Sequence, residues 1–379
     1  MLDTNFIANI TATRKALHAH PEVSGEEVHT QKGIIRFLKN ETNSVIEKIT
    51  KTGVLATFSA VADGPAVMIR GDIDALPIIE TNDFKHRSIK EGVSHKCGHD
   101  GHTAILLGLA ILLSKQPISK GKVMLLFQPS EENGMGAKAV LNDVVFKNLK
   151  IDYAFALHNL PGYPLHEIVV KENEFTGNVK SIIIKLNGKT SHAAEPEKGM
   201  NPSLAIAELL QYAHKITLND VASKDFFLAT PVHVTMGELA YGVSAGYGEV
   251  HFTIRSWSAT IMGAKTQELV AFIHKVSKSH QLKSAITWTQ VFTATMNHAS
   301  AVKSIKNAAK YNGYVVSQRK YPFKWGEDFG LFTQQFKGAM FGLGAGEETP
   351  ALHNPDYDFP DEVLPTGINM FLEIIKSLN

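Results

Sequence analysis

Four side chains that bind transition metals lie within eight consecutive residues, His95-Lys96-Cys97-Gly98-His99-Asp100-Gly101-His102. Thiolate and imidazole are the ligands that suit zinc and related metals. Gly98 relaxes the backbone between Cys97 and His99, so both donors can turn toward one ion. A lone cysteine is more often a small buried apolar residue, and a Cys-x-His pair alone is weak evidence. The segment therefore predicts a metal site if distant ligands join it.

Two adjacent carboxylates form a second group, in Gln128-Pro129-Ser130-Glu131-Glu132. If both glutamates were desolvated, their charges would repel each other, and coordination of a cation by one of them removes that cost. The other glutamate would then be available as a general base for hydrolysis. A solvated acidic loop is the alternative interpretation.

Two further histidines follow apolar residues where a strand or turn is expected to end, in Ala156-Leu157-His158-Asn159 and in Leu352-His353-Asn354-Pro355. At such positions the rings could point into a cleft. A single histidine is more often structural, so the remaining ones are interpreted as packing or surface residues: His18, His20, His29, His214, His274 and His280.

The elements that must position these side chains alternate between strand and helix. Apolar runs at 66–70, 122–127 and 153–157 indicate strands, and 103–115 indicates a buried helix between the first two. This order predicts an α/β fold with a mixed, largely parallel sheet flanked by helices, in which ligands gather beyond the carboxyl ends of the strands. Asp72, Glu131, Glu132 and His158 all follow expected strand ends.

The pattern changes between residues 178 and 290 to strand, helix, two strands, helix and strand, the order of a ferredoxin-like α+β domain. We therefore expect a metal-binding domain formed by 1–177 and 291–379, with 178–290 inserted into it as a small domain. The expected strands of the insert are 181–186, 231–239, 249–256 and 285–292, and its helices are 202–216 and 262–280.

Composition narrows the class of protein. With 379 residues, two domains are the default expectation. Lysine and arginine number 38 against 37 acidic residues, which argues against nucleic-acid binding and a polybasic membrane surface and favours a small-molecule substrate. A single cysteine excludes an intramolecular disulfide framework, the first residues lack a secretory signal pattern, and the apolar stretch 104–113 is too short to span a bilayer. We expect a cytoplasmic protein.

Taken together, eight ordered motifs resemble those of a known family. They are RKALHAHPEVSGEE, RGDIDALPI, HKCGHDGHTA, FQPSEE, ALHN, SHAAEPEKGMNP, GEDFG and LHNPDYDF. In this order they resemble the metal-dependent amidohydrolases related to bacterial aminoacylases, a group that includes hippurate hydrolases, N-acetyldiaminopimelate deacetylases and auxin-conjugate hydrolases. The resemblance covers nearly the whole chain.

The resemblance implies a zinc-peptidase-like catalytic domain with two divalent cations, whether zinc, manganese, cobalt or nickel. It implies Glu131 as the base and Asp72 as the carboxylate that supports a histidine ligand, although Asp72 could equally cap the strand end. Asp100 and His102 are not implied as ligands. The implied ligands are Cys97 as the bridging thiolate, His99, Glu132, His158 and His353.

The resemblance also implies that 178–290 is a lid domain beside the catalytic domain and that it mediates a homodimer. His192 would then reach the partner's active site as the oxyanion donor. A loop histidine at a turn is the alternative. Arg255 could pair with a substrate carboxylate, but an exposed edge-strand arginine is the simpler explanation. The chain departs from the family at two places. It has Gly242-Val243-Ser244-Ala245 where relatives usually carry Asn-Val-Ile-Pro, and it has Glu197 where a histidine is common.

The expected function is hydrolysis of the acyl-amide bond of an N-acyl amino acid or small conjugate, by metal-activated water with Glu131 as general base. One alternative is a dipeptidase or carboxypeptidase that uses the same two-metal centre. Another is a thiol hydrolase with Cys97 as nucleophile and His99 or His102 as base. A third alternative is a metal-binding protein without catalytic activity, and the presence of Glu131 argues against it.

Overall fold

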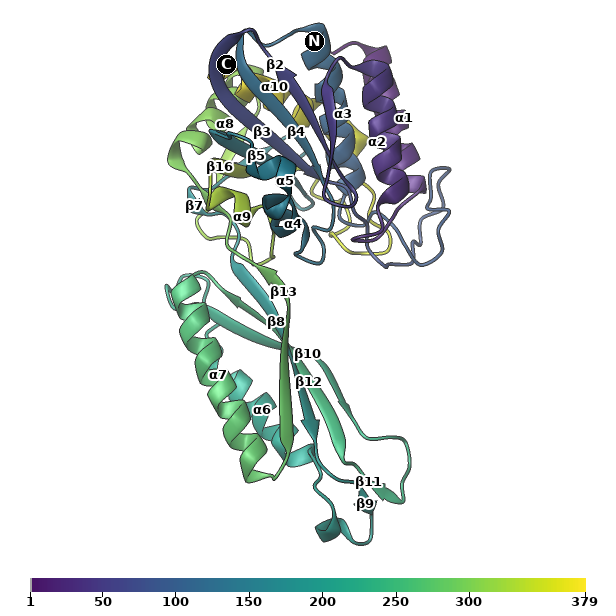
Figure 1. Ribbon diagram of the computed structural model, residues 1–379, viewed down its shortest axis with the longest axis vertical. Coiled ribbons are helices and arrows are strands. Elements are labelled where there is room, and N and C mark those ends of the chain that lie inside the picture. The colour runs from purple at the N-terminus through teal and green to yellow at the C-terminus, as the bar shows by residue number, and fades with distance from the viewer. Residues whose placement is uncertain (1) are drawn as a thin grey trace. The chain divides into compact units, whose positions relative to one another are not determined.

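The computed structural model describes residues 2–379, and the chain divides into two compact units (Figure 1). Unit 1 comprises Met1–Phe175, Thr295–Lys320 and Glu327–Asn379, and unit 2 comprises Thr176–Ala294 and Tyr321–Gly326. Unit 2 is therefore inserted into unit 1, and it also takes in a short segment that follows much later in the chain. The α/β class predicted from the sequence is confirmed.

Unit 1 is built on one eight-stranded mixed sheet in the order β1-β2-β4-β3-β5-β16-β6-β15. The four central strands β4, β3, β5 and β16 are mutually parallel, whereas β1 and β2 join antiparallel at one side. The strands are β1 (Val45–Ile49), β2 (Gly53–Ser59), β3 (Ala62–Asp72), β4 (Lys120–Gln128), β5 (Tyr153–Leu160), β6 (Ile168–Val170), β15 (Val316–Gln318) and β16 (Lys337–Gly344). A short pair, β7 (Asn173–Glu174) and β14 (Met296–Asn297), lies outside this sheet.

Helices cover both faces of this sheet because its central strands are apolar on both sides, as parallel strands usually are. In Figure 1, α10 lies behind the sheet and α4 and α5 lie in front of it. Val67 and Ile69 of β3 share a buried core with Leu109 of α3 and Ile374 of α10. The helices of unit 1 are α1 (Thr4–Ala19), α2 (Val28–Glu41), α3 (His99–Lys115), α4 (Gly136–Asn142), α5 (Val144–Lys147), α8 (Ala299–Asn312), α9 (Gly330–Thr333) and α10 (Leu364–Leu378), with a 3₁₀ turn at Asp361–Val363.

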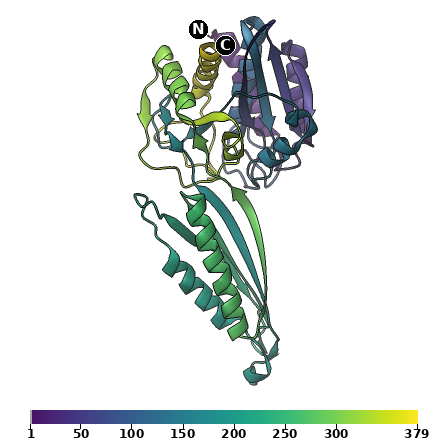
Figure 2. The same cartoon turned by 60° about the vertical axis from the view of Figure 1, so that its left-hand side comes forward.

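Unit 2 has an antiparallel four-stranded sheet in the order β10-β12-β8-β13. Figure 2 shows α6 and α7 side by side along one face of it. Ile182 and Ile184 of β8, Leu209 of α6 and Ile273 of α7 form the shared core. The elements are β8 (Asn178–Asn187), β9 (Ser191–His192), a 3₁₀ turn (Pro196–Lys198), α6 (Ser203–Ile216), β10 (Phe227–Met236), β11 (Val243–Ser244), β12 (Tyr247–Ser256), α7 (Ala259–Ser279) and β13 (Lys283–Phe292).

The order of the main elements of unit 2 is the one predicted from the sequence, but β10 lies earlier in the chain than expected. The sequence predicts a strand over 231–239, whereas β10 begins at Phe227, passes through Pro231 and ends at Met236. Proline cannot donate to a neighbouring strand, yet β10 is an edge strand and has a bulge between Pro231 and His233, where proline is tolerated.

Among residues 2–379, no helix is both long and apolar enough to cross a membrane.

Candidate metal centre

The first predicted ligands are placed by the start of α3. Gly98 precedes the helix with φ +92°, a left-handed conformation that favours glycine, and His99 is the first helical residue. A Cβ atom at Gly98 would lie 2.8 Å from the side-chain amide of Asn159 and 2.9 Å from the hydroxyl of Tyr357. The turn that joins Cys97 to His99 therefore requires glycine both for its backbone angle and for space.

All five predicted ligands meet at the carboxyl ends of the central strands of unit 1, where His158 lies near the end of β5 rather than after it. Cys97 Sγ lies 3.6 Å from His158 Nε2, and Glu132 lies 3.8 Å from both His99 Nε2 and His353 Nε2. The ligand atoms of Cys97, His99 and His158 all lie within 4.8 Å of one another, and so do those of Cys97, Glu132 and His353. Cys97 belongs to both groups, which is the position expected of a bridging ligand.

Two of these donors have buried atoms without a hydrogen-bond partner. They are Nε2 of His99 and Oε1 of Glu132, which face each other at 3.8 Å. An unpaired buried polar atom costs on the order of 1–3 kcal/mol, so a native site needs a reason for leaving two of them side by side. A divalent cation bound between an imidazole and a carboxylate removes this cost, and the donor set therefore fits the metals that the sequence predicts.

The pKa shifts of Glu131 and Glu132 also favour a bound cation. Burial, together with the negative charges of Glu327 and Glu132, raises the pKa of Glu131 well above its usual range. Burial also raises the pKa of Glu132 to about 7, although His99 acts against this. Such crowding of carboxylates is unfavourable in a protein interior unless cations balance it.

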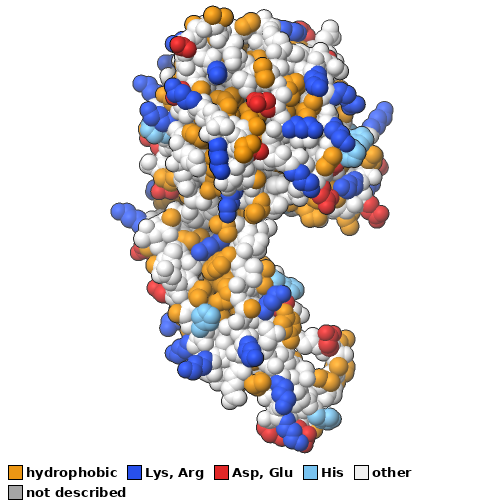
Figure 3. All heavy atoms as spheres, viewed as in Figure 1, with side chains coloured by type: hydrophobic (Ala, Val, Ile, Leu, Met, Phe, Trp, Pro, Cys, Tyr) orange, Lys and Arg blue, Asp and Glu red, His pale blue; other side chains and the backbone are white. Residues whose placement is uncertain are grey.

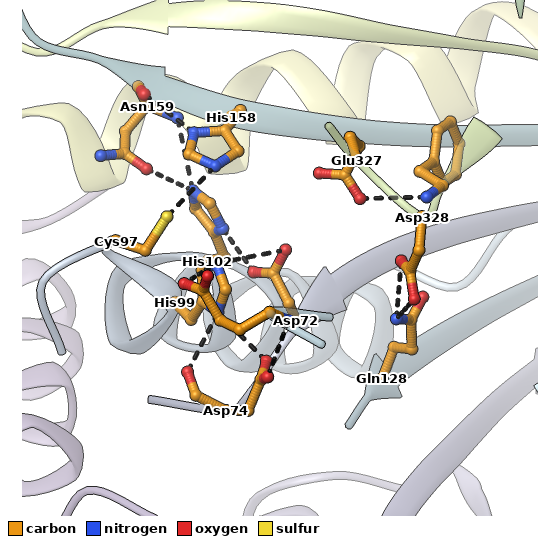
Figure 4. A network of polar contacts seen from close by, with 12 residues as sticks. Asp72, Asp74, Cys97, His99, His102, Gln128, His158, Asn159, Glu327 and Asp328 are labelled. Atoms are coloured by element: carbon orange, nitrogen blue, oxygen red, sulfur yellow. Dashed lines mark hydrogen bonds and ion pairs between the residues drawn. The ribbon is translucent and has the colours of Figure 1, made fainter. Parts of the chain in front are cut away.

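Asp72 lies near two histidines, and its Oδ2 is 3.7 Å from Nε2 of the predicted ligand His99. Asp72 Oδ1 lies 2.5 Å from Nδ1 of His102, which is not among the predicted ligands. His99 Nδ1 instead lies 3.2 Å from Asp74 Oδ1 and 3.0 Å from the backbone oxygen of Asp74 (Figure 4). The carboxylate that orients the ring of His99 is therefore Asp74, which the sequence analysis did not single out.

A buried arginine balances the remaining carboxylates. Arg70 donates from Nη1 to Asp72 (2.5 Å) and from Nη2 to Glu327 (2.9 Å) and Asp328 (2.8 Å). Gln128 accepts from Arg70 Nε at 2.9 Å. It donates to Asp328, as Figure 4 shows. This network gives the GEDFG motif a place in the structure, beside the strand ends that carry the site.

His192 and Arg255 belong to unit 2. His192 is exposed on β9, opposite Val243 of β11, and its Nδ1 accepts a hydrogen bond from the backbone N–H of Ala194 at 3.0 Å. An imidazole that accepts at Nδ1 carries its proton on Nε2, so His192 presents a donor there. Arg255 Nε donates to the backbone oxygen of Lys324 at 3.0 Å.

An α/β unit with a cysteine, histidine and glutamate cluster beyond its strand ends is typical of metallohydrolases. Comparison with known proteins agrees. The model of peptidase family M20/M25/M40 matches residues 68–377, and the chain belongs to this family. This confirms the resemblance found in the sequence.

Individual relatives align over most of the chain. The N-acetylcysteine deacetylase of Bacillus subtilis (strain 168) is 29% identical over 377 residues, which cover 99% of this chain and 98% of the relative. The N-acetyldiaminopimelate deacetylase of Priestia megaterium is 30% identical over 336 residues, covering 88% and 89%. Among solved structures, the YXEP protein of Bacillus subtilis, a dinuclear metal binding peptidase from the M20 family, has a TM-score of 0.83 and 28% identity and covers 99% of both chains.

Proposed function

We propose that this protein is a metal-dependent amidohydrolase that removes the acyl group from N-acyl amino acids, with two divalent cations held by Cys97, His99, Glu132, His158 and His353. The observation that carries the proposal is the convergence of these donors, with unpaired atoms of His99 and Glu132 facing each other. The names of the deacetylase relatives and of the dinuclear neighbour support it.

Bound divalent cations would polarise the scissile carbonyl and make water more acidic at neutral pH. Glu131 would accept the proton of the attacking water and pass it to the leaving amine. The side chain of Glu131 is 6% exposed and its pKa is raised by burial and by Glu327, which suits a group that must both take up and release a proton. His192 would donate from Nε2 to the oxygen that becomes negative during attack.

We also propose that unit 2 is a lid that forms a homodimer. β10 is an edge strand, and Val232, Val234 and Met236 on it are 57%, 44% and 43% exposed. Hydrophobic side chains are visible on unit 2 in Figure 3. Exposed apolar residues along an unpaired strand edge favour pairing with a second copy. His192 would then act on the partner's substrate.

A cytoplasmic location fits the same site, because the ligand Cys97 must stay a reduced thiol, as it does most readily in that compartment.

The function is tested with a panel of N-acetyl amino acids and dipeptides, assayed with zinc, manganese, cobalt or nickel. We expect turnover of the acetyl amino acids, loss of activity on chelation and recovery when a cation is returned. If only dipeptides are cleaved, the protein is a dipeptidase on the same centre.

The thiol-hydrolase alternative finds little support in the geometry. His102 is hydrogen-bonded to Asp72 and Asn159, and His99 Nδ1 to Asp74, so neither proposed base is hydrogen-bonded to Cys97. His158 is the ring nearest the thiol, at 3.6 Å. Activity that survives complete removal of metal and is lost on alkylation of Cys97 would favour the covalent mechanism.

A further inference from the structure

We propose that Tyr357 is a positioning residue of the metal centre, which fixes the two segments that carry His158 and His353 against the segment that carries Cys97. This inference rests on the proposed function, because it gives Tyr357 a part in the cation affinity of that site. Tyr357 is fully buried, and its hydroxyl oxygen accepts a hydrogen bond from Nδ2 of Asn159 at 2.5 Å.

Asn159 connects this hydroxyl to the ligand His158. The backbone oxygen of Asn159 lies 2.9 Å from Nδ1 of His158, so the ring donates there and turns Nε2 toward Cys97 Sγ. A hydrogen bond from one ring nitrogen to a carbonyl is the usual way in which a ligand histidine is oriented. The side chain of Asn159 is held in turn by His102, whose Nε2 lies 2.7 Å from Oδ1.

The backbone of Tyr357 also belongs to the segment that carries His353, and both residues are hydrogen-bonded to Lys96. The backbone N–H of His353 donates to the backbone oxygen of Lys96 at 2.7 Å, and Lys96 Nζ donates to the backbone oxygen of Tyr357 at 2.7 Å. Lys96 directly precedes Cys97 and is fully buried, and its other acceptors are Glu80 at 2.6 Å and Asn82 at 2.8 Å. The segment from 353 to 357 is thus tied at both ends to the residue beside Cys97.

His353 needs such a restraint, because its backbone has φ +67°. A residue other than glycine keeps such a sparsely populated backbone conformation only where the surroundings enforce it. Two bonds to Lys96 hold this segment, one at His353 and one at Tyr357, and the hydroxyl of Tyr357 anchors the Tyr357 end to Asn159. Tyr357 therefore acts on cation binding through Asn159 and through the backbone of His353, without being a ligand.

Tyr357→Phe tests this inference, because it removes the hydroxyl and keeps the ring. We expect the affinity for zinc or cobalt, measured on the apo protein by competition with a chromogenic chelator, to fall by about 10-fold or more, as is typical when a group that orients a ligand is lost. The sulfur-to-cobalt absorption band should persist, because Cys97 is unchanged. Tyr314→Phe is the matched control: its hydroxyl also accepts from an asparagine, Asn369 Nδ2 at 3.2 Å, away from the centre.

Asn159→Ala removes the same hydrogen bond from the other side and provides a second variant if Tyr357→Phe folds poorly. If the two residues act through their shared bond, the double variant should lose no more affinity than the weaker-binding single variant. Wild-type affinity in Tyr357→Phe, an equal loss in Tyr314→Phe, or independent losses in the double variant would overturn the inference. Failure of the wild-type protein to bind cations would instead contradict the proposed function.

Discussion

Replacing Asp74 by asparagine distinguishes the two aspartates at the end of β3. Asp74 Oδ1 faces His99 Nδ1 at 3.2 Å, and Oδ2 accepts from Ser24 Oγ at 2.7 Å and from the backbone N–H of Glu132 at 3.0 Å. An asparagine offers one oxygen and one NH₂ group. Whichever way the amide turns, it sets a donor against either the ring N–H of His99 or the N–H of Glu132, so at least one of these bonds is lost.

The expected loss of zinc affinity depends on which hydrogen bonds to His99 remain in Asp74→Asn. Loss of a group that orients a metal ligand typically weakens metal binding by about 10- to 100-fold, which corresponds to about 1.4–2.7 kcal/mol. The backbone oxygen of Asp74 also accepts from His99 Nδ1, at 3.0 Å, and the substitution leaves this bond intact. The ring therefore keeps its tautomer, and we expect a loss near the lower end, about 10-fold.

The assay is competition for zinc between the apo protein and a chromogenic chelator, in Asp74→Asn and in wild type. Asp143→Asn is the control, because Asp143 also accepts from two backbone N–H groups, those of Thr50 (2.7 Å) and Val145 (2.8 Å), but contacts no histidine. We expect the control to bind zinc as wild type does. Unchanged affinity in Asp74→Asn, or an equal loss in Asp143→Asn, would refute the role of Asp74.

Three further outcomes are expected. Glu131→Gln should keep its bound metal, measured by elemental analysis, and lose about 100- to 10,000-fold in kcat, the range for loss of a general base; unchanged turnover would exclude Glu131 as the base. Burial acts to lower the pKa of His18, but hydrogen bonds to Asp100 and Glu80 raise it to about 9. A raised pKa stabilises the fold fully below about pH 6.5, and this stabilisation is lost as the pH rises through 9. Between pH 6 and 10 the free energy of unfolding of wild type should therefore drop about 3 kcal/mol more than that of His18→Gln. Parallel curves of unfolding free energy against pH would contradict the raised pKa of His18. Val234→Lys should convert a dimer to monomer in light scattering while leaving the melting temperature nearly unchanged, and a wild type that is monomeric would contradict the dimer proposal.

The ligand set was predicted from the resemblance to the amidohydrolases. The strand pattern supports part of it, because Glu132 and His158 follow expected strand ends, and parallel strands bring those ends to one edge of the sheet. The sequence did not separate Asp72 from Asp74, which lie two residues apart and face the same way. Two strand residues span about 6.6 Å and one helical turn about 5 Å, so the pairs Asp72 with His102 and Asp74 with His99 form together. Only the direction of α3 relative to β3 decides which aspartate meets the ligand.

The burial of some polar residues could not be predicted, because it depends on contacts between segments that are far apart in the sequence. Arg70 is an apparently ordinary end to an apolar run, yet it is fully buried among Asp72, Glu327 and Asp328. Tyr357 stands between two aspartates in a polar stretch, yet it is fully buried as well. In both cases the residue is buried because its polar atoms find partners far away in the sequence, and those partners cannot be identified from periodicity.

The wide spacing of the proposed ligands has a consequence for biosynthesis. Cys97 and His353 are separated by about 250 residues, with all of Thr176–Ala294 of unit 2 between them. At roughly 5–20 residues per second, a ribosome needs on the order of tens of seconds to make that stretch. During this interval the nascent chain exposes a thiol and two histidines without their last companion, so full-affinity loading with metal must await near-completion of the polypeptide.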